Sequence, residues 1–173
     1  MNINVSPAQM KRLIEIIRFC EKHYDAETFA HAMRVACIST TLGIGIEDKG
    51  ELFVSALCHD LIEDTDVTLD DLRTFLSSSS SFNIDYTYCL SAIECVTRQK
   101  ETETYQEYIK RIKNKGSYDA QIIKIADLKD HLEQKDGLKE SLKDRYVDAL
   151  CELLGEWGDY NEENIIYVNG RHL

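Results

Sequence analysis

Apolar residues along the chain recur mainly at intervals of three and four, which is the spacing of an amphipathic α-helix. The first such stripe runs over residues 10–20 and follows Ser6-Pro7, where Ser6 can cap a helix and Pro7 suits its first turn. A second stripe predicts a helix over about residues 26–41, ended by Leu42-Gly43. Similar patterns predict further helices over about residues 49–58, 68–76, 85–97, 103–114, 117–131 and 138–157.

The pattern therefore predicts an all-α fold, a helical bundle. One Pro and eight Gly leave few helix breakers, and 173 residues suit a single domain, 1–173, with a real core. The serine run at residues 77–81 is expected to be a connecting loop without a catalytic part. Residues 162–173 carry no motif, and a strand, an interface arm and a loose end all stay open for them.

The composition, 29% charged and 43% hydrophobic, is that of a soluble globular protein. No apolar run reaches membrane-spanning length, and residues 1–5 lack the basic and apolar regions of a signal peptide, so we expect a cytoplasmic protein with no membrane partner. Six cysteines show no CxxC spacing, and several lie in apolar stretches. They are expected to be reduced core residues rather than zinc ligands or disulfides.

The net charge of −11 argues against a nucleic-acid partner, because binding to phosphate backbones needs a basic face. Residues 98–124 reverse this balance with seven basic and four acidic residues, against 13 and 27 in the remainder, so a small polyphosphate can still bind there. Arg98 and Lys124 are the candidates for that role. The other basic residues are expected on a solvated helix face, in pairs such as Glu107 with Arg111.

The candidate chemistry lies in the sequence His59-Asp60-Leu61-Ile62-Glu63-Asp64, which follows the apolar run 52–57. Adjacent His and Asp can bind one cation where the backbone turns sharply, as it does at the end of a helix. Four ionisable groups beside apolar sequence are costly to bury without a cation that compensates them. Asp127 also lies among apolar residues, where a carboxylate needs a partner. These features predict a metal site.

Residues 56–68, AlaLeuCysHisAspLeuIleGluAspThrAspValThr, resemble the signature of the HD-domain hydrolases of RelA/SpoT type. They most resemble the small, free-standing members, which remove pyrophosphate from guanosine 3',5'-bis(diphosphate). The resemblance covers about residues 28–132 and includes Val96-Thr97-Arg98 and the stretch 124–128. It implies an HD-domain bundle and a metal held by His31, His59, Asp60 and Asp127.

Mixed nitrogen and oxygen ligands suit Mn, Fe or Zn, and the resemblance favours Mn²⁺. In this interpretation a water activated by the metal attacks the phosphate, while Glu63 and Asp64 orient that water and move its proton. The pair is typical of the active pyrophosphohydrolases of the family. The expected substrate is a small phosphorylated nucleotide, and its expected contacts are Arg34, Arg98, Tyr108, Lys124 and His131.

Two departures from the family keep other functions open. Small members have a basic segment with Gly and Pro around the first ligand, and the corresponding residues 22–33 contain neither. The family usually has Asn where this chain has His131, which either keeps a hydrogen bond to the ribose or marks a different substrate. The alternatives are an HD phosphatase for another phosphorylated nucleotide or metabolite, and an inactive nucleotide-binding module. The sequence leaves the oligomeric state open.

Overall fold

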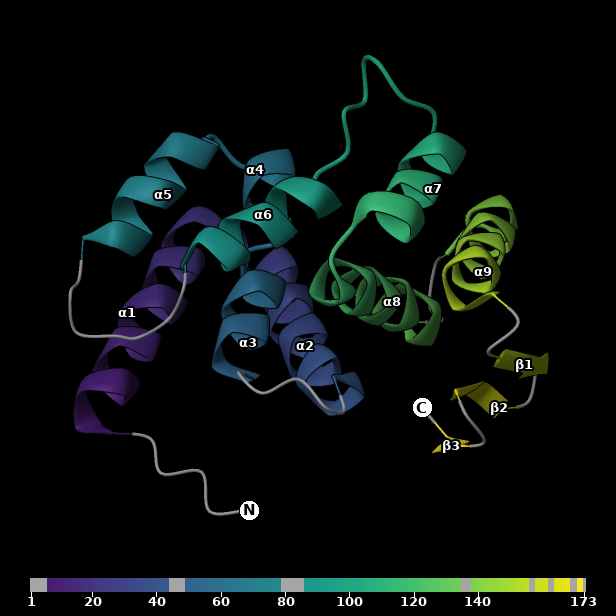
Figure 1. Cartoon of the computed structure of the whole chain (residues 1–173), viewed down its shortest axis with the longest axis horizontal. Coiled ribbons are helices and arrows are strands. Elements are labelled where there is room, and N and C mark those ends of the chain that lie inside the picture. Colours follow the sequence, from purple (N-terminus) through teal and green to yellow (C-terminus); the bar gives the residue numbers. More distant parts are fainter. Residues whose placement is uncertain are drawn as a thin grey trace.

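The structure, a computed structural model, is a bundle of helices with a small sheet near its C-terminal end (Figure 1). It describes residues 6–43, 49–78, 86–134 and 138–155, and the backbone of three strands. The predicted helical bundle is confirmed. In these described residues the helices are α1 (Pro7–His23), α2 (Ala26–Leu42), α3 (Lys49–Leu57), α4 (Leu61–Asp64), α5 (Leu69–Ser77), α6 (Tyr86–Val96), α7 (Tyr105–Lys115), α8 (Tyr118–Glu133) and α9 (Glu140–Leu154).

Side-chain caps fix where several helices begin. Ser6 accepts a hydrogen bond from the backbone of Gln9, as the sequence predicts, and Thr68 accepts one from Asp71 and Ser117 one from Ala120. Thr104 caps α7 in the same way, and its capping box uses Glu107. Of the serine run at residues 77–81, which the sequence analysis expects to be a loop, residues 79–81 lie outside the described residues.

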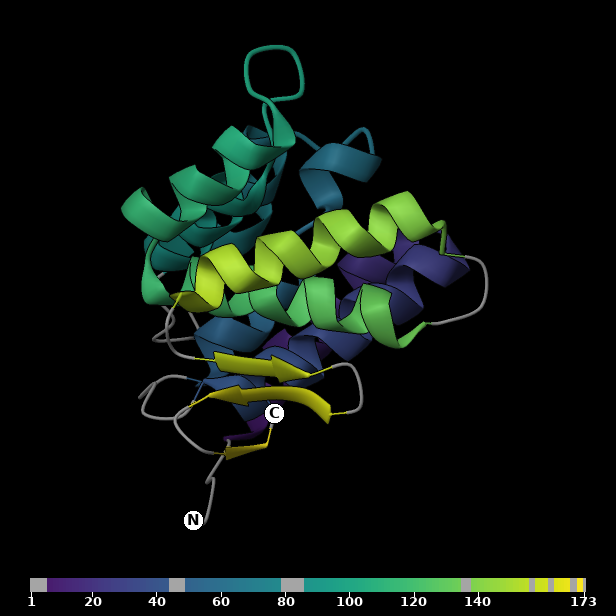
Figure 2. The same ribbon diagram turned by 90° about the vertical axis from the view of Figure 1, so that its right-hand side faces the viewer.

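Helix α2 lies at the centre of the bundle, packed against both α3 and α8. Helices α1, α5 and α6 lie on one side of this centre in Figure 1, and α7 and α9 on the other. Figure 2 shows α9 lying across the outer side of α8. Fully buried side chains such as Leu57, Ile93 and Ile123 come from α3, α6 and α8, so one core joins the central helices.

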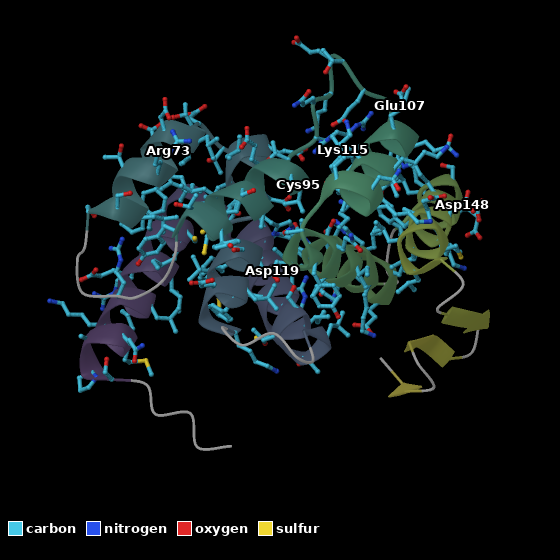
Figure 3. All side chains as sticks on the ribbon, viewed as in Figure 1. Arg73, Cys95, Glu107, Lys115, Asp119 and Asp148 are labelled. Carbon is cyan, nitrogen blue, oxygen red and sulfur yellow. The ribbon has the colours of Figure 1, made fainter. Side chains whose placement is uncertain are left out.

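Charged side chains on the outer helices point away from this core. Figure 3 shows Arg73 on α5, Glu107 on α7 and Asp148 on α9 at the periphery of the bundle, and all three are exposed. The predicted pair of Glu107 with Arg111 is wrong, because Glu107 caps α7 and Arg111 pairs with Glu103 at 2.8 Å. Arg111 also donates to two backbone carbonyls of residues 95–97, so this cation holds the loop before α7 in place.

The last helix ends at Leu154, with Gly155 at φ 59°, a conformation that glycine adopts without strain. The prediction extended this helix to Trp157, which lies outside the described residues. Strands β1 (Gly158–Asn161), β2 (Asn164–Val168) and β3 (Arg171–His172) then form an antiparallel sheet in the order β1-β2-β3. Of the possibilities left open for residues 162–173, the strand is the one found.

None of the helices in the described parts of the chain is both long and apolar enough to cross a membrane.

Candidate metal centre

Three separate parts of the bundle bring the predicted metal ligands together. Helix α2 supplies His31, α8 supplies Asp127, and the turn between α3 and α4 supplies His59 and Asp60. The Nε2 atom of His31 lies 3.2 Å from Asp127 Oδ1 and 3.6 Å from Asp60 Oδ2. The Nε2 atom of His59 lies 3.0 Å from Asp60 Oδ2 and 3.8 Å from Asp127 Oδ1.

A sharp turn makes it possible for adjacent residues to face the same point. Helix α3 ends at Leu57, residues 58–60 form the turn, and α4 begins at Leu61. The backbone N–H of His59 donates to Ala56 at 3.4 Å, and that of Leu61 donates to Cys58 at 3.2 Å. These backbone bonds form a turn at residues 58–60, where the sequence analysis expects the backbone to turn sharply.

The separations match those between ligands of a single ion. A transition metal lies about 2.0–2.2 Å from nitrogen and oxygen ligands, so neighbouring ligand atoms are about 3.0–3.5 Å apart. The four contacts between the histidine nitrogens and the aspartate oxygens are 3.0, 3.2, 3.6 and 3.8 Å. The two imidazole and two carboxylate groups therefore fit one divalent cation without a rearrangement of the backbone.

Hydrogen bonds leave the inward-facing atoms available. The Nδ1 atom of His31 lies 2.7 Å from a carboxylate oxygen of Asp130, and that of His59 lies 2.8 Å from the Ala56 carbonyl. Both partners only accept, so each Nδ1 carries the proton and each Nε2 is free to bind a metal. His31 Nε2, His59 Nε2 and Asp127 Oδ1 are buried and have no hydrogen-bond partner in the described residues. A cation would satisfy all three atoms.

The electrostatics of the cluster also call for positive charge. Burial lowers the pKa of His59, but the carboxylates of Asp60 and Asp127 outweigh it and raise this pKa to about 10. Burial raises the pKa of Asp127, yet Lys124 and the surrounding imidazoles hold it well below its ordinary value. Without a metal, a protonated histidine supplies the positive charge that stabilises the ionised carboxylates. A bound metal supplies that charge instead and displaces the proton.

Asp130 is a site residue that the sequence analysis did not assign. It is 1% exposed, accepts the hydrogen bond from His31, and forms two hydrogen bonds with Arg34 at 2.7 and 2.9 Å. Asp130 and His31 are separated by 99 positions, so no local pattern could pair them. Arg34 therefore lies next to His31 as expected, but two of its guanidinium nitrogens bind Asp130, and its contact with a phosphate stays a prediction.

We expect Asp130→Asn to weaken divalent-cation affinity by about 10- to 100-fold, because the carboxylate orients His31 and raises its basicity. Isothermal titration with Mn²⁺ measures this change. The matched variant Arg34→Gln keeps the contact between Asp130 and His31, so its cation affinity should stay close to that of the unaltered protein. Equal losses in both variants would contradict a separate role for Asp130.

The two acidic residues that follow the turn differ in their surroundings. Glu63 accepts a hydrogen bond from the Arg98 backbone at 2.6 Å and pairs with Lys100 at 3.2 Å, so it holds the loop before α7. Asp64 is exposed, and no described residue donates a hydrogen bond to its carboxylate. Partial desolvation and then the charge of Asp60 raise the pKa of Asp64, although Lys100 opposes this. Of the pair, Asp64 is the one whose carboxylate accepts no hydrogen bond from a described residue, and the transfer of a proton by either residue stays a prediction.

Lys124 contacts the predicted ligand Asp127, and Tyr108 lies next to Lys124. The Lys124 ammonium lies 2.5 Å from Asp127 Oδ2 and 5.2 Å from the centre of the Tyr108 ring. Tyr108 is 2% exposed, and its hydroxyl donates to the Val96 carbonyl. This arrangement gives Tyr108 a packing role under Lys124 and does not support a direct contact with substrate. The phosphate contact of Lys124 stays a prediction.

Tyr105 and Arg145 lie near the predicted metal ligands, and the sequence analysis assigns neither residue to the site. The hydroxyl of Tyr105 is buried without a hydrogen-bond partner in the described residues, and so is Arg98 Nε. The guanidinium of Arg145 lies 4.6 Å from the centre of the Tyr105 ring, and that of Arg98 lies 5.7 Å from it. Two cations and an unpaired hydroxyl thus gather around one ring.

His131 follows Asp127 by one helical turn on α8, and its Nε2 lies 3.2 Å from Asp127 Oδ1. Its ring stacks on that of His31 at 4.6 Å and on that of Tyr146 at 5.3 Å. The structure therefore brings His131 to the four predicted ligands, and its contact with a ribose stays a prediction.

Comparison with known proteins identifies the family. The HD domain family model matches residues 28–153. The chain belongs to the HD domain family. The adjacent His59 and Asp60 match the His-Asp pair after which the family is named. Membership of the family supports a metal-dependent hydrolase with a divalent cation. The match begins at the residue where the predicted resemblance begins and continues through most of α9.

A solved structure of a metazoan ortholog of SpoT has the same fold as this HD domain. The two align with a TM-score of 0.62 and 20% sequence identity over 86% of this chain and 84% of that one. That ortholog is described as hydrolysing ppGpp and playing a role in starvation responses. At this identity the similarity shows the fold alone. No curated protein matches the chain significantly.

Proposed function

We propose that this HD domain is a metal-dependent pyrophosphohydrolase that removes pyrophosphate from guanosine 3',5'-bis(diphosphate) or a close nucleotide relative. The observation that carries the proposal is the set of buried atoms of His31, His59 and Asp127 that lie close together and have no hydrogen-bond partner among the described residues. Asp64 follows the turn closely in sequence, and no described residue donates a hydrogen bond to its carboxylate. Support for the substrate comes from the HDxxED motif of residues 59–64 and from the activity described for the metazoan ortholog.

The ligand residues are His31, His59, Asp60 and Asp127, and the resemblance favours Mn²⁺ as the cation. When bound, the cation lowers the pKa of a water and polarises a phosphoryl oxygen. Asp64 accepts the proton of the attacking water, which its position one turn after Asp60 allows. Glu63 holds the loop that carries Arg98, and Arg98 is proposed to contact the substrate's phosphates.

The phosphate contacts proposed for Arg98 and Lys124 agree with the charge distribution. Both residues lie near Tyr105, beside Arg145, in a protein of net charge −11. Cations gathered around one ring attract a polyphosphate anion despite the overall negative charge of the protein. The products proposed are a nucleoside 5'-diphosphate and pyrophosphate. The predicted cytoplasmic location accords with such a substrate and stays a prediction.

A turnover screen tests the substrate. Purified protein is incubated with guanosine 3',5'-bis(diphosphate) and a panel of other nucleotides and phosphorylated metabolites, in Mn²⁺ and in chelator. We expect release of pyrophosphate from the first nucleotide with Mn²⁺ and none with chelator. Cleavage of another compound alone would favour the alternative HD phosphatase, to which the departures in residues 22–33 and at His131 point. Tight binding without any turnover would favour an inactive binding module.

A further inference from the structure

The ring of His131 is held against the cluster by its neighbours. The ring of Tyr146 on α9 lies 5.3 Å from the His131 ring at an interplanar angle of 27°, and the ring of His31 lies 4.6 Å from it at 26°. The side chain is 40% exposed, so its ring has an inward edge and an outward edge. The inward edge presents Nε2 to Asp127 Oδ1 at 3.2 Å.

This contact does not have the geometry of a hydrogen bond. Asp127 Oδ1 has three histidine nitrogens around it, from His31 at 3.2 Å, His131 at 3.2 Å and His59 at 3.8 Å. Nevertheless Oδ1 is buried and accepts no hydrogen bond from any described residue. Nitrogen and oxygen atoms that are close but not directed at one another are typical of ligands arranged around a common ion.

The ring separations give a second, independent indication. The centre of a coordinated imidazole lies about 3.2 Å from the ion, so two rings at an angle of about 90° are about 4.5 Å apart, and at a tetrahedral angle about 5.2 Å. His31 and His131 are 4.6 Å apart, and His31 and His59 are 5.4 Å apart. Each of these two separations fits a pair of imidazoles on one ion.

Helical spacing makes the joint contact of Asp127 and His131 possible. Residues four apart lie on the same face of a helix, which is how the two histidines of the HExxH motif bind one zinc ion. The ligand atoms of His31, Asp127 and His131 all lie within 4.8 Å of one another, as do those of His31, His59 and Asp60. The two triads share His31, so each offers ligands to an ion that lies beside His31.

We propose that His131 is a fifth protein ligand of the cation, which makes the centre one of three imidazoles and two carboxylates. The proposal rests on the cation site proposed above. A third nitrogen ligand favours later and softer metals, so the centre should gain more affinity for Co²⁺ and Zn²⁺ than for Mn²⁺ from this residue. His131 thereby sets the choice of metal in this HD domain, besides any contact it makes with the substrate.

Titration of the metal-free full chain with Co²⁺, Zn²⁺ and Mn²⁺ tests this inference. We expect one ion per chain, and His131→Asn should lower Co²⁺ and Zn²⁺ affinity by about 10-fold or more and Mn²⁺ affinity by less. The visible absorption of bound Co²⁺ should also change, since it reports the number and kind of ligands. His23→Asn is the matched control, because His23 lies on α1 against Phe19 and should leave affinity and spectrum unchanged.

Each outcome decides the matter. His131→Asn with the affinity and Co²⁺ spectrum of the unaltered protein would overturn the proposal and leave the four-ligand site intact. Two ions per chain, falling to one in the variant, would also overturn it and would assign His131 to a separate ion. An unaltered protein that binds none of the three metals would remove the cation site itself. If His131→Asn fails to fold, the same titrations on His131→Gln, which also lacks the imidazole, test the proposal instead.

Discussion

The variant Asp64→Asn should lose about 10²- to 10⁴-fold in turnover while it binds Mn²⁺ as tightly as the unaltered protein. Asn has nearly the same shape as Asp but cannot take up a proton at neutral pH. The Asp64 carboxylate receives no hydrogen bond from a described residue, so the change breaks no structural contact that would affect folding. Steady-state kinetics and isothermal titration on the same preparation measure the two quantities.

Asp66→Asn is the matched control for this prediction. Asp66 is also exposed and lies only two residues further along the chain, beyond the end of α4. The control should keep full turnover, which separates the loss of a proton carrier from a general loss of negative charge near the site. An Asp64→Asn protein that retains normal turnover would contradict the role given to Asp64.

The second large effect is expected for Asp127→Asn, which should lose both metal binding and stability. Asp127 is 3% exposed and pairs with Lys124, whose ammonium is also largely buried. Removing one partner of a buried ion pair leaves the other charge uncompensated, which costs about 3–5 kcal/mol of unfolding free energy. Urea unfolding in the presence of chelator measures this cost without any contribution from a bound metal.

Glu133→Gln provides the control on the same helix. Glu133 pairs with Lys129 at 2.7 Å but is 38% exposed, so its loss should change the unfolding free energy by no more than about 1 kcal/mol. Mn²⁺ should stabilise this control and the unaltered protein against urea, and should not stabilise Asp127→Asn. Stabilisation of Asp127→Asn by Mn²⁺ to the same extent would show that Asp127 is not a ligand.

Local sequence patterns predicted most of the helices because the determinants of a helix are local. Ser6, Thr68 and Ser117 cap helices through side chains that reach only three residues along the chain. The turn at His59-Asp60 could be predicted for the same reason. The choice of partner for Arg111 was wrong, because Glu103 lies in the preceding loop, and the path of a loop does not follow from helical spacing.

Site residues that belong to one short sequence motif could be predicted. Site residues that come into contact only through the packing of distant helices could not. His59, Asp60, Glu63 and Asp64 lie within six consecutive residues, whereas Asp130 reaches His31 only because α8 packs against α2. The prediction of Tyr108 as a substrate contact had the same difficulty. Tyr105 and Tyr108 are three residues apart on α7, and the rotation of that helix turns the first toward Arg145 and buries the second.

The account depends on four side chains from separate parts of the chain meeting at one cation. Anomalous diffraction from crystals soaked in Mn²⁺ tests this most directly, because it locates the ion without any assumption about activity. We predict a single strong peak about 2.0–2.3 Å from the nearest atoms of His31, His59, Asp60 and Asp127. Crystals saturated with Mn²⁺ that show no peak among these residues would contradict the account.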